Sequence, residues 1–172
     1  MKGNDNMITT YLADQILELI IANKGSIEIA DEKTSMECWL GFSTTTPNID
    51  GTNFTEPNST THPSYGRVRL HVNAYMSDAS RWTNKWGTVA NATVENIDEV
   101  VTNECLEDDG WGAFTHFGIF TKETDGTLLA YDLLTDPDGV PDENGRYPAK
   151  VLSIAKNNVA VFRVGTLKLS LR

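Results

Sequence analysis

Hydrophobic residues recur at every third or fourth position near the start of the chain, which is the spacing of an amphipathic helix. The pattern predicts a helix over residues 8–23, with Thr9 or Thr10 as its N-cap and Lys24-Gly25 at its end. Its apolar stripe either packs on the chain's own β domain or docks on a neighbouring subunit. We expect residues 1–25 to be a docking or oligomerisation segment ahead of a β domain over residues 26–172. The stripe consists of Ile8, Tyr11, Leu12, Ile16, Leu19 and Ile20.

From Ile27 onward the pattern changes to short apolar runs separated by Gly, Pro, Asn, Asp and Thr, which is typical of an all-β domain. Apolar residues occupy both sides of the run at 158–164, so we expect that strand to be buried on both faces. The predicted fold class is mainly β, an antiparallel β-sandwich of jelly-roll or immunoglobulin-like type with an N-terminal α-helix and long loops. The predicted strands lie at 36–43, 66–73, 86–90, 113–120, 128–134, 151–154, 158–164 and 166–171.

Two long polar segments separate the predicted strands. The first, residues 44–64, is rich in Thr and Asn and holds three prolines, and loops of such length are usually functional or disordered. We interpret it as an extended arm or lip that contacts a neighbour through Thr45, Pro47 and Phe54, the plainer alternative being a mobile surface loop. The second, residues 136–145, is expected to be a solvated acidic loop.

The charge balance narrows the choice of partners. The chain has 24 acidic and 14 basic residues, a formal net charge of −10. Such a surface repels a phosphate backbone and an anionic membrane, so we expect no direct nucleic-acid or membrane partner. The start of the chain carries no signal-peptide pattern, which predicts synthesis as a soluble cytosolic chain.

Cys38 and Cys105 are the two cysteines, and no Cys-x-x-Cys pattern is present. The default interpretation is two buried thiols in a reducing compartment. A single disulfide between them stays open, because the sequence does not give their separation.

The sequence lacks a serine-nucleophile elbow, a P-loop and a dinucleotide fingerprint. The histidines are not paired at zinc-ligand spacing, so each is expected on the surface or on a β face. Two acidic clusters are interpreted as solvated loops rather than a glycosidase pair or a calcium loop, since adjacent like charges usually mark exposed turns. We therefore expect neither catalysis nor a cofactor or metal. The clusters are Glu104, Glu107, Asp108 and Asp109, and Asp136, Asp138, Asp142 and Asn144.

The tryptophans raise a second class of function, because exposed aromatic rings stack on sugars. Trp39 falls within an apolar strand and is expected in the core. Trp82 and Trp86 are flanked by basic and amide residues, which suits either a glycan platform or a subunit interface.

The chain carries, in order, the strand end and loop LGFSTTTP at 40–47, an acidic residue at Glu56, YGRVRL at 65–70, Asn91-Ala92, WGAFTHFGIF at 111–120 and TDGTLL at 124–129. In this order and spacing the motifs resemble a phage tail-fibre-like family of virion structural proteins. Within the last motif, Thr124-Asp125-Gly126 predicts a hairpin turn with Gly126 at the position of positive φ. The resemblance covers about residues 39–134.

The resemblance implies a non-enzymatic virion protein, tail- or connector-associated, made in the host cytoplasm. Its implied partners are copies of itself, as a ring or another homo-oligomer, and other virion structural proteins. The alternatives are a carbohydrate- or receptor-binding module of a tail tip and a capsid decoration protein. The position in the particle and the symmetry stay open.

Overall fold

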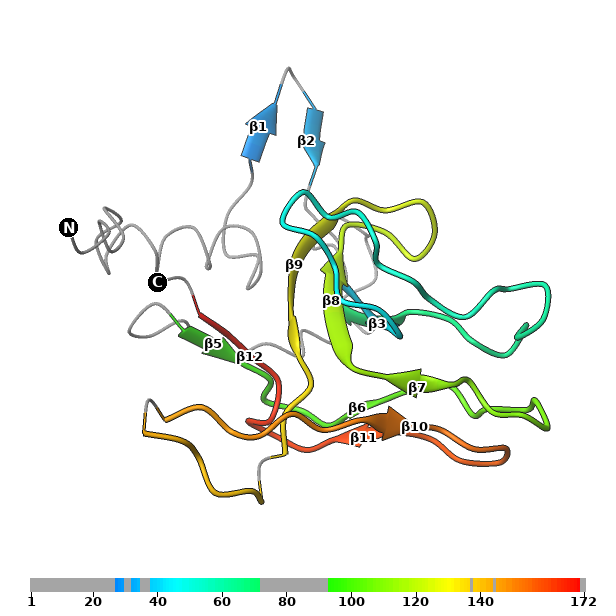
Figure 1. The fold of residues 1–172 in the computed structure, drawn as a ribbon. Coiled ribbons are helices and arrows are strands. Elements are labelled where there is room, and N and C mark those ends of the chain that lie inside the picture. Colours follow the sequence, from blue (N-terminus) through cyan, green and yellow to red (C-terminus); the bar gives the residue numbers. More distant parts are fainter. Residues whose placement is uncertain are drawn as a thin grey trace. The chain divides into compact units, whose positions relative to one another are not determined.

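The computed structural model describes residues 27–29, 32–34, 38–71, 93–136, 138–143 and 145–170 (Figure 1). The chain divides into two compact units, which we call the sheet unit and the composite unit. The predicted helix over 8–23 and the predicted strand at 86–90 lie outside the described residues. The sheet unit comprises Cys38–Arg69 and Val101–Val161, and the composite unit comprises Met1–Glu37, Leu70–Val100 and Phe162–Arg172.

The sheet unit contains most of a four-stranded sheet of order β4-β3-β8-β9, in which the last two residues of β4 are assigned to the composite unit. β3, β8 and β9 are labelled in Figure 1. β3 pairs antiparallel with β8, and β8 pairs antiparallel with β9, so that Gly118 lies between Gly41 and Tyr131. Every residue of β8 is buried, and successive side chains point to opposite faces, so both faces of this strand are covered. The strands are β3 (Cys38–Ser43), β4 (Val68–His71), β8 (His116–Phe120) and β9 (Leu128–Leu133).

The core of the sheet unit gathers apolar side chains from β3, β8 and a short strand before β8. Leu40, Phe42, Phe114 and Ile119 are fully buried, and the rings of Phe42 and Phe114 lie 5.5 Å apart. The short strand, β7 (Ala113–Phe114), pairs antiparallel with β10 (Leu152–Ser153). The predicted strand at 113–120 is thus divided at Thr115, whose N–H donates to the Ser43 carbonyl at 2.9 Å.

The composite unit contains short strand pairs and a buried asparagine. Asn96 is buried, and its side-chain oxygen accepts the Leu167 N–H at 2.9 Å, while its amide donates to the carbonyls of Asp98 and Arg163. Because a buried amide is costly unless its groups are paired, these bonds fix the chain around Asn96. β1 (Ile27–Ile29) pairs with β2 (Glu32–Thr34), and β5 (Thr93–Glu95) pairs with β12 (Lys168–Ser170). The chain passes between the units four times: before β3, within β4, within β6 (Val100–Val101) and within β11 (Val161–Phe162).

The described strands confirm a mainly β chain with antiparallel sheets, and the sandwich arrangement stays a prediction. No helix in the described part of the chain is long and apolar enough to cross a membrane. Cys38 and Cys105 are both buried and are not joined in a disulfide, as the default interpretation expects, while the reducing compartment stays a prediction.

Three local expectations are wrong. The strand at 158–164 is not buried on both faces, because Val159, Val161 and Val164 are 44%, 49% and 58% exposed, and its regular strand is β11, Val161–Phe162. Trp39 is only half-buried, with the Arg69 guanidinium over its ring at 5.4 Å. In the turn after β8, the residue of positive φ is Asp125 rather than Gly126. A short polar side chain tolerates this left-handed conformation.

Candidate functional site

The first half of the 44–64 segment folds back on the end of β3. The Thr44 N–H donates to the Thr55 carbonyl at 3.0 Å, and the Thr55 N–H donates to the Ser43 hydroxyl at 2.8 Å. The Thr45 hydroxyl donates to Thr55 Oγ1 at 2.9 Å, and Pro47 is buried. These bonds form a narrow hairpin-like loop.

At the tip of this loop, residues 48–52 form a tight turn that holds an isoleucine outward. The Asn48 N–H donates to the Thr52 carbonyl at 2.8 Å, and the Gly51 N–H donates to the Asn48 carbonyl at 2.9 Å. Asp50 Oδ1 accepts from both the N–H and the hydroxyl of Thr52 at 3.0 and 2.7 Å. Within this network Ile49 is 99% exposed. The turn therefore holds the exposed isoleucine side chain in an ordered position.

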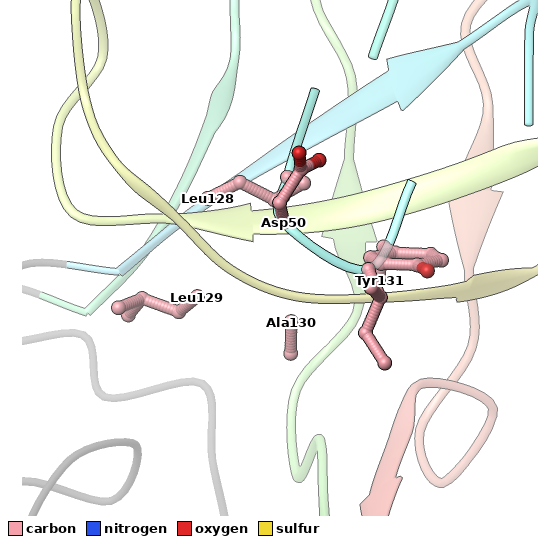
Figure 2. A pocket seen from close by; sticks show the side chains of 7 residues that line it. Asp50, Leu128, Leu129, Ala130 and Tyr131 are labelled. Carbon is pink, nitrogen blue, oxygen red and sulfur yellow. The ribbon is translucent and has the colours of Figure 1, made fainter. Parts of the chain in front are cut away.

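Beside the turn lies a shallow hollow of about 330 Å³ against β9 (Figure 2). Its walls are residues 49–51 of the turn and Leu128 to Tyr131 of the strand. The side-chain and backbone hydrogen bonds from Thr52 lower the pKa of Asp50, which therefore carries a negative charge in the wall of the hollow at neutral pH. The hollow thus combines aliphatic side chains, an aromatic ring and a fixed anion.

Among the described strands, β9 lies at the edge of its sheet, with β8 as its neighbour. The Leu134 N–H points into the sheet and donates to the Thr115 carbonyl at 2.9 Å. Alternate residues of an antiparallel strand direct their N–H and C=O groups to opposite sides, so those of Tyr131 and Leu133 face away from β8. The Asp132 carboxylate accepts the Leu133 N–H at 2.7 Å. Among described residues, the outward backbone of Tyr131 has no backbone partner.

Beneath the loop, Phe54 anchors the segment to the sheet. Its ring meets Phe120 edge-on at 5.0 Å between centroids. It also lies over Gly118, where an added Cβ would be 2.6 Å from the Phe54 ring. Gly118 is therefore needed for the close approach of loop and sheet.

A partly buried ion pair follows the loop. Arg67 Nη2 contacts Glu56 Oε2 at 2.6 Å, its guanidinium lies 3.4 Å from the centre of the Phe120 ring, and Nη1 donates to the Lys122 carbonyl at 2.9 Å. The Tyr65 hydroxyl donates to Glu56 Oε1 at 2.7 Å, and burial, together with the Glu56 charge, raises the pKa of Tyr65. This group supports the fold, because all its charges are paired within the unit.

The cluster that precedes Trp111 is not simply a solvated loop, as expected, because Glu107 joins two segments. The Ser64 N–H donates to Glu107 Oε1 at 2.9 Å, and the Ser64 hydroxyl and the Trp111 indole N–H donate to Oε2. Desolvation raises the pKa of Glu107, but the hydrogen bonds from Ser64 and Trp111 outweigh it and lower the pKa to about 2. Asp108 and Asp109 are exposed, as expected for the rest of this loop.

The second acidic cluster is dispersed. Asp136 pairs with Lys150 at 2.9 Å, and the Asp142 carboxylate accepts the Arg146 N–H at 2.8 Å, while Asn144 lies outside the described residues. In the described part of the chain, no three His, Cys, Asp or Glu side chains gather as a metal site requires.

The structure locates three of the predicted interface residues. Thr45, Pro47 and Phe54 lie in the loop that carries Ile49, with Pro47 buried and Phe54 packed on the sheet. Their role in an interface stays a prediction. Ile49 itself was not predicted from the sequence, although an isolated isoleucine between Asn48 and Asp50 was a usable signal. Seven further predicted contact residues lie outside the described residues: Ile8, Tyr11, Leu12, Ile16, Leu19, Trp82 and Trp86.

The chain was compared with known protein families, and one family model covers most of it. The model of the family described as "Podophage GP4 fiber I protein gp80" matches residues 7–161, well over half of the chain. The matched range contains all of residues 39–134, which carry the tail-fibre-like motifs. No curated protein matches the chain.

Proposed function

The chain belongs to the family of the podophage GP4 fiber I protein gp80, and on that basis we propose that it is a tail- or connector-associated structural protein of a bacteriophage particle. It acts by assembling with copies of itself and by binding other virion proteins. The observation that carries the proposal is the family match over residues 7–161. Membership in this family agrees with the sequence resemblance to phage tail-fibre-like proteins.

Two structural observations support a role in assembly. Ile49 is 99% exposed on a hydrogen-bonded turn, where a partner can cover it. Among the described residues, the outward backbone of Tyr131 on β9 has no backbone partner. Open strand edges of this kind favour pairing with another chain.

The direct test is the composition of purified phage particles. Mass spectrometry of gradient-purified particles is expected to find the chain in a fixed ratio to a major tail protein. Particles from phage with a stop codon in this gene are expected to lack the chain and the structure that it forms in electron micrographs. Absence of the chain from wild-type particles would refute the proposal.

A further inference from the structure

The edge of β9 and the hollow beside it form a surface that fits an added strand. The outward N–H and C=O groups of Tyr131 lie on this edge, and the Asn48–Thr52 turn bounds it from one side. A peptide that pairs with an edge strand gains main-chain hydrogen bonds, and hollows beside the edge receive its side chains. The hollow of about 330 Å³ offers such a place.

Ile49 gives this surface an apolar contact that is already ordered. Its side chain is 99% exposed, and the turn beneath it is held by bonds of Asn48, Asp50 and Thr52. A partner that covers Ile49 therefore gains apolar burial with little ordering of this chain.

The charges around the edge select the kind of partner. Residues 48–52 and 121–133 contain four carboxylates and one basic residue. The hydrogen bonds from Thr52 keep Asp50 ionised, and Asp132 is exposed on the strand itself. An acidic segment would be repelled from this edge, and a second copy of a chain with net charge −10 meets the same repulsion. A basic segment is attracted. The carboxylates are Asp50, Glu123, Asp125 and Asp132, and the basic residue is Lys122.

We propose that β9 binds an extended, basic segment of another virion protein by strand addition, with aliphatic side chains of that segment against Ile49 and the hollow. The segment pairs with the outward backbone of Tyr131 and places Lys or Arg near Asp50 and Asp132. This inference rests on the proposed role in the virion and names the partner chemistry of one of its surfaces.

The probe is a nine-residue peptide of alternating lysine and valine, titrated into the full chain by calorimetry. Binding with one peptide per chain is expected, together with slower hydrogen exchange of the Tyr131 amide. Two N-methylated versions, each blocking one of the two alternating sets of amides, provide the backbone test. One version is expected to lose binding and the other to keep it, because only one set can face the edge.

Matched variants test the surface. Ile49→Lys is expected to weaken peptide binding at least about tenfold, whereas Val140→Lys, the same change at a residue that is 88% exposed elsewhere in the unit, stays within about twofold. Both positions are exposed, so folding is preserved and is checked by circular dichroism. A glutamate-valine peptide is expected not to bind.

Three results would overturn the inference: no binding of the lysine-valine peptide, equal binding of the glutamate peptide, or equal binding of both N-methylated peptides. A loss of oligomer mass in Ile49→Lys without peptide binding would also overturn it, in favour of a second copy on this edge. These failures are distinct from failure of the proposed function, which is read from the composition of purified particles.

Discussion

The indole N–H of Trp111 donates to the carboxylate of Glu107 at 2.9 Å, and the same carboxylate ties the segment after Cys105 to Ser64 at the end of the 44–64 loop. The same carboxylate accepts the Ser64 N–H at 2.9 Å. One side chain thus closes a contact between segments that are 43 residues apart.

Acid is expected to release this contact. The folded pKa of Glu107 is about 2, against an ordinary value of 4.5, so the carboxylate contributes stability that is present above about pH 4.5 and is lost as the pH falls through about 2. Urea unfolding followed by circular dichroism from pH 6 to about pH 2 measures the loss. Glu107→Gln should be less stable at pH 6 and show a flatter pH dependence than the wild type. Glu104→Gln, an exposed acid of the same loop, is the control, and an unchanged profile in Glu107→Gln would contradict the role of the contact.

Gly118→Ala is expected to destabilise the sheet unit. The new Cβ would lie 2.6 Å from both Leu128 Cδ1 and Phe54 Cε2, so loop and strand must move apart. Overpacking of this kind costs about 1–3 kcal/mol. Gly66→Ala is the matched control, because its Cβ would meet only the end of the flexible Asn103 side chain, and it should change stability by less than about 0.5 kcal/mol. Equal unfolding midpoints for the two variants would show that Gly118 is not needed for the close approach.

Arg67→Ala is expected to cost about 3–5 kcal/mol in chemical unfolding, because it leaves the partly buried Glu56 carboxylate without its cation. Arg67→Lys should recover only part of this loss. Lysine cannot reproduce the bidentate hydrogen bonds of the guanidinium to Glu56 or its stacking on Phe120. Adding Glu56→Gln to Arg67→Ala should restore some stability by removing the unpaired charge. Wild-type stability in Arg67→Lys would refute this account.

The fold was predictable where local pattern determines it. β3, β8 and β9 are apolar runs of five or six residues, and they lie where the sequence predicts them. β5 and β6 have three and two residues, and β5 is defined by its pairing with β12, far along the chain, which no local pattern encodes. Glu107 was unpredictable for the same reason, because its partner Ser64 is distant in sequence.

The two cysteines should be unreactive in the folded protein. Cys38 and Cys105 have no exposed surface, and burial raises the pKa of the Cys105 thiol, which lowers its thiolate fraction. A chromogenic disulfide reagent should therefore detect almost no thiol in the native protein and two in denaturant without reductant. Detection of fewer than two thiols in denaturant would indicate a disulfide.

Removal of residues 1–24 is expected to leave the β chain folded and to weaken assembly. The predicted amphipathic stripe from Ile8 to Ile20 provides the reason, since a stripe that docks on a neighbour is lost with the segment. Size-exclusion chromatography with light scattering compares the mass of the full and shortened chains. An unchanged oligomer mass would place the assembly contacts elsewhere.

The composite unit is assembled from three separate stretches, and this sets the order in which a ribosome can deliver it. Thr93 pairs with Ser170 near the end of the chain. The composite unit therefore cannot complete its fold until nearly the whole chain has left the exit tunnel. The sheet unit is complete once Val161 has emerged and can form earlier. A prematurely terminated product therefore carries an unfinished composite unit, which leaves it open to proteases before it can reach an assembling particle.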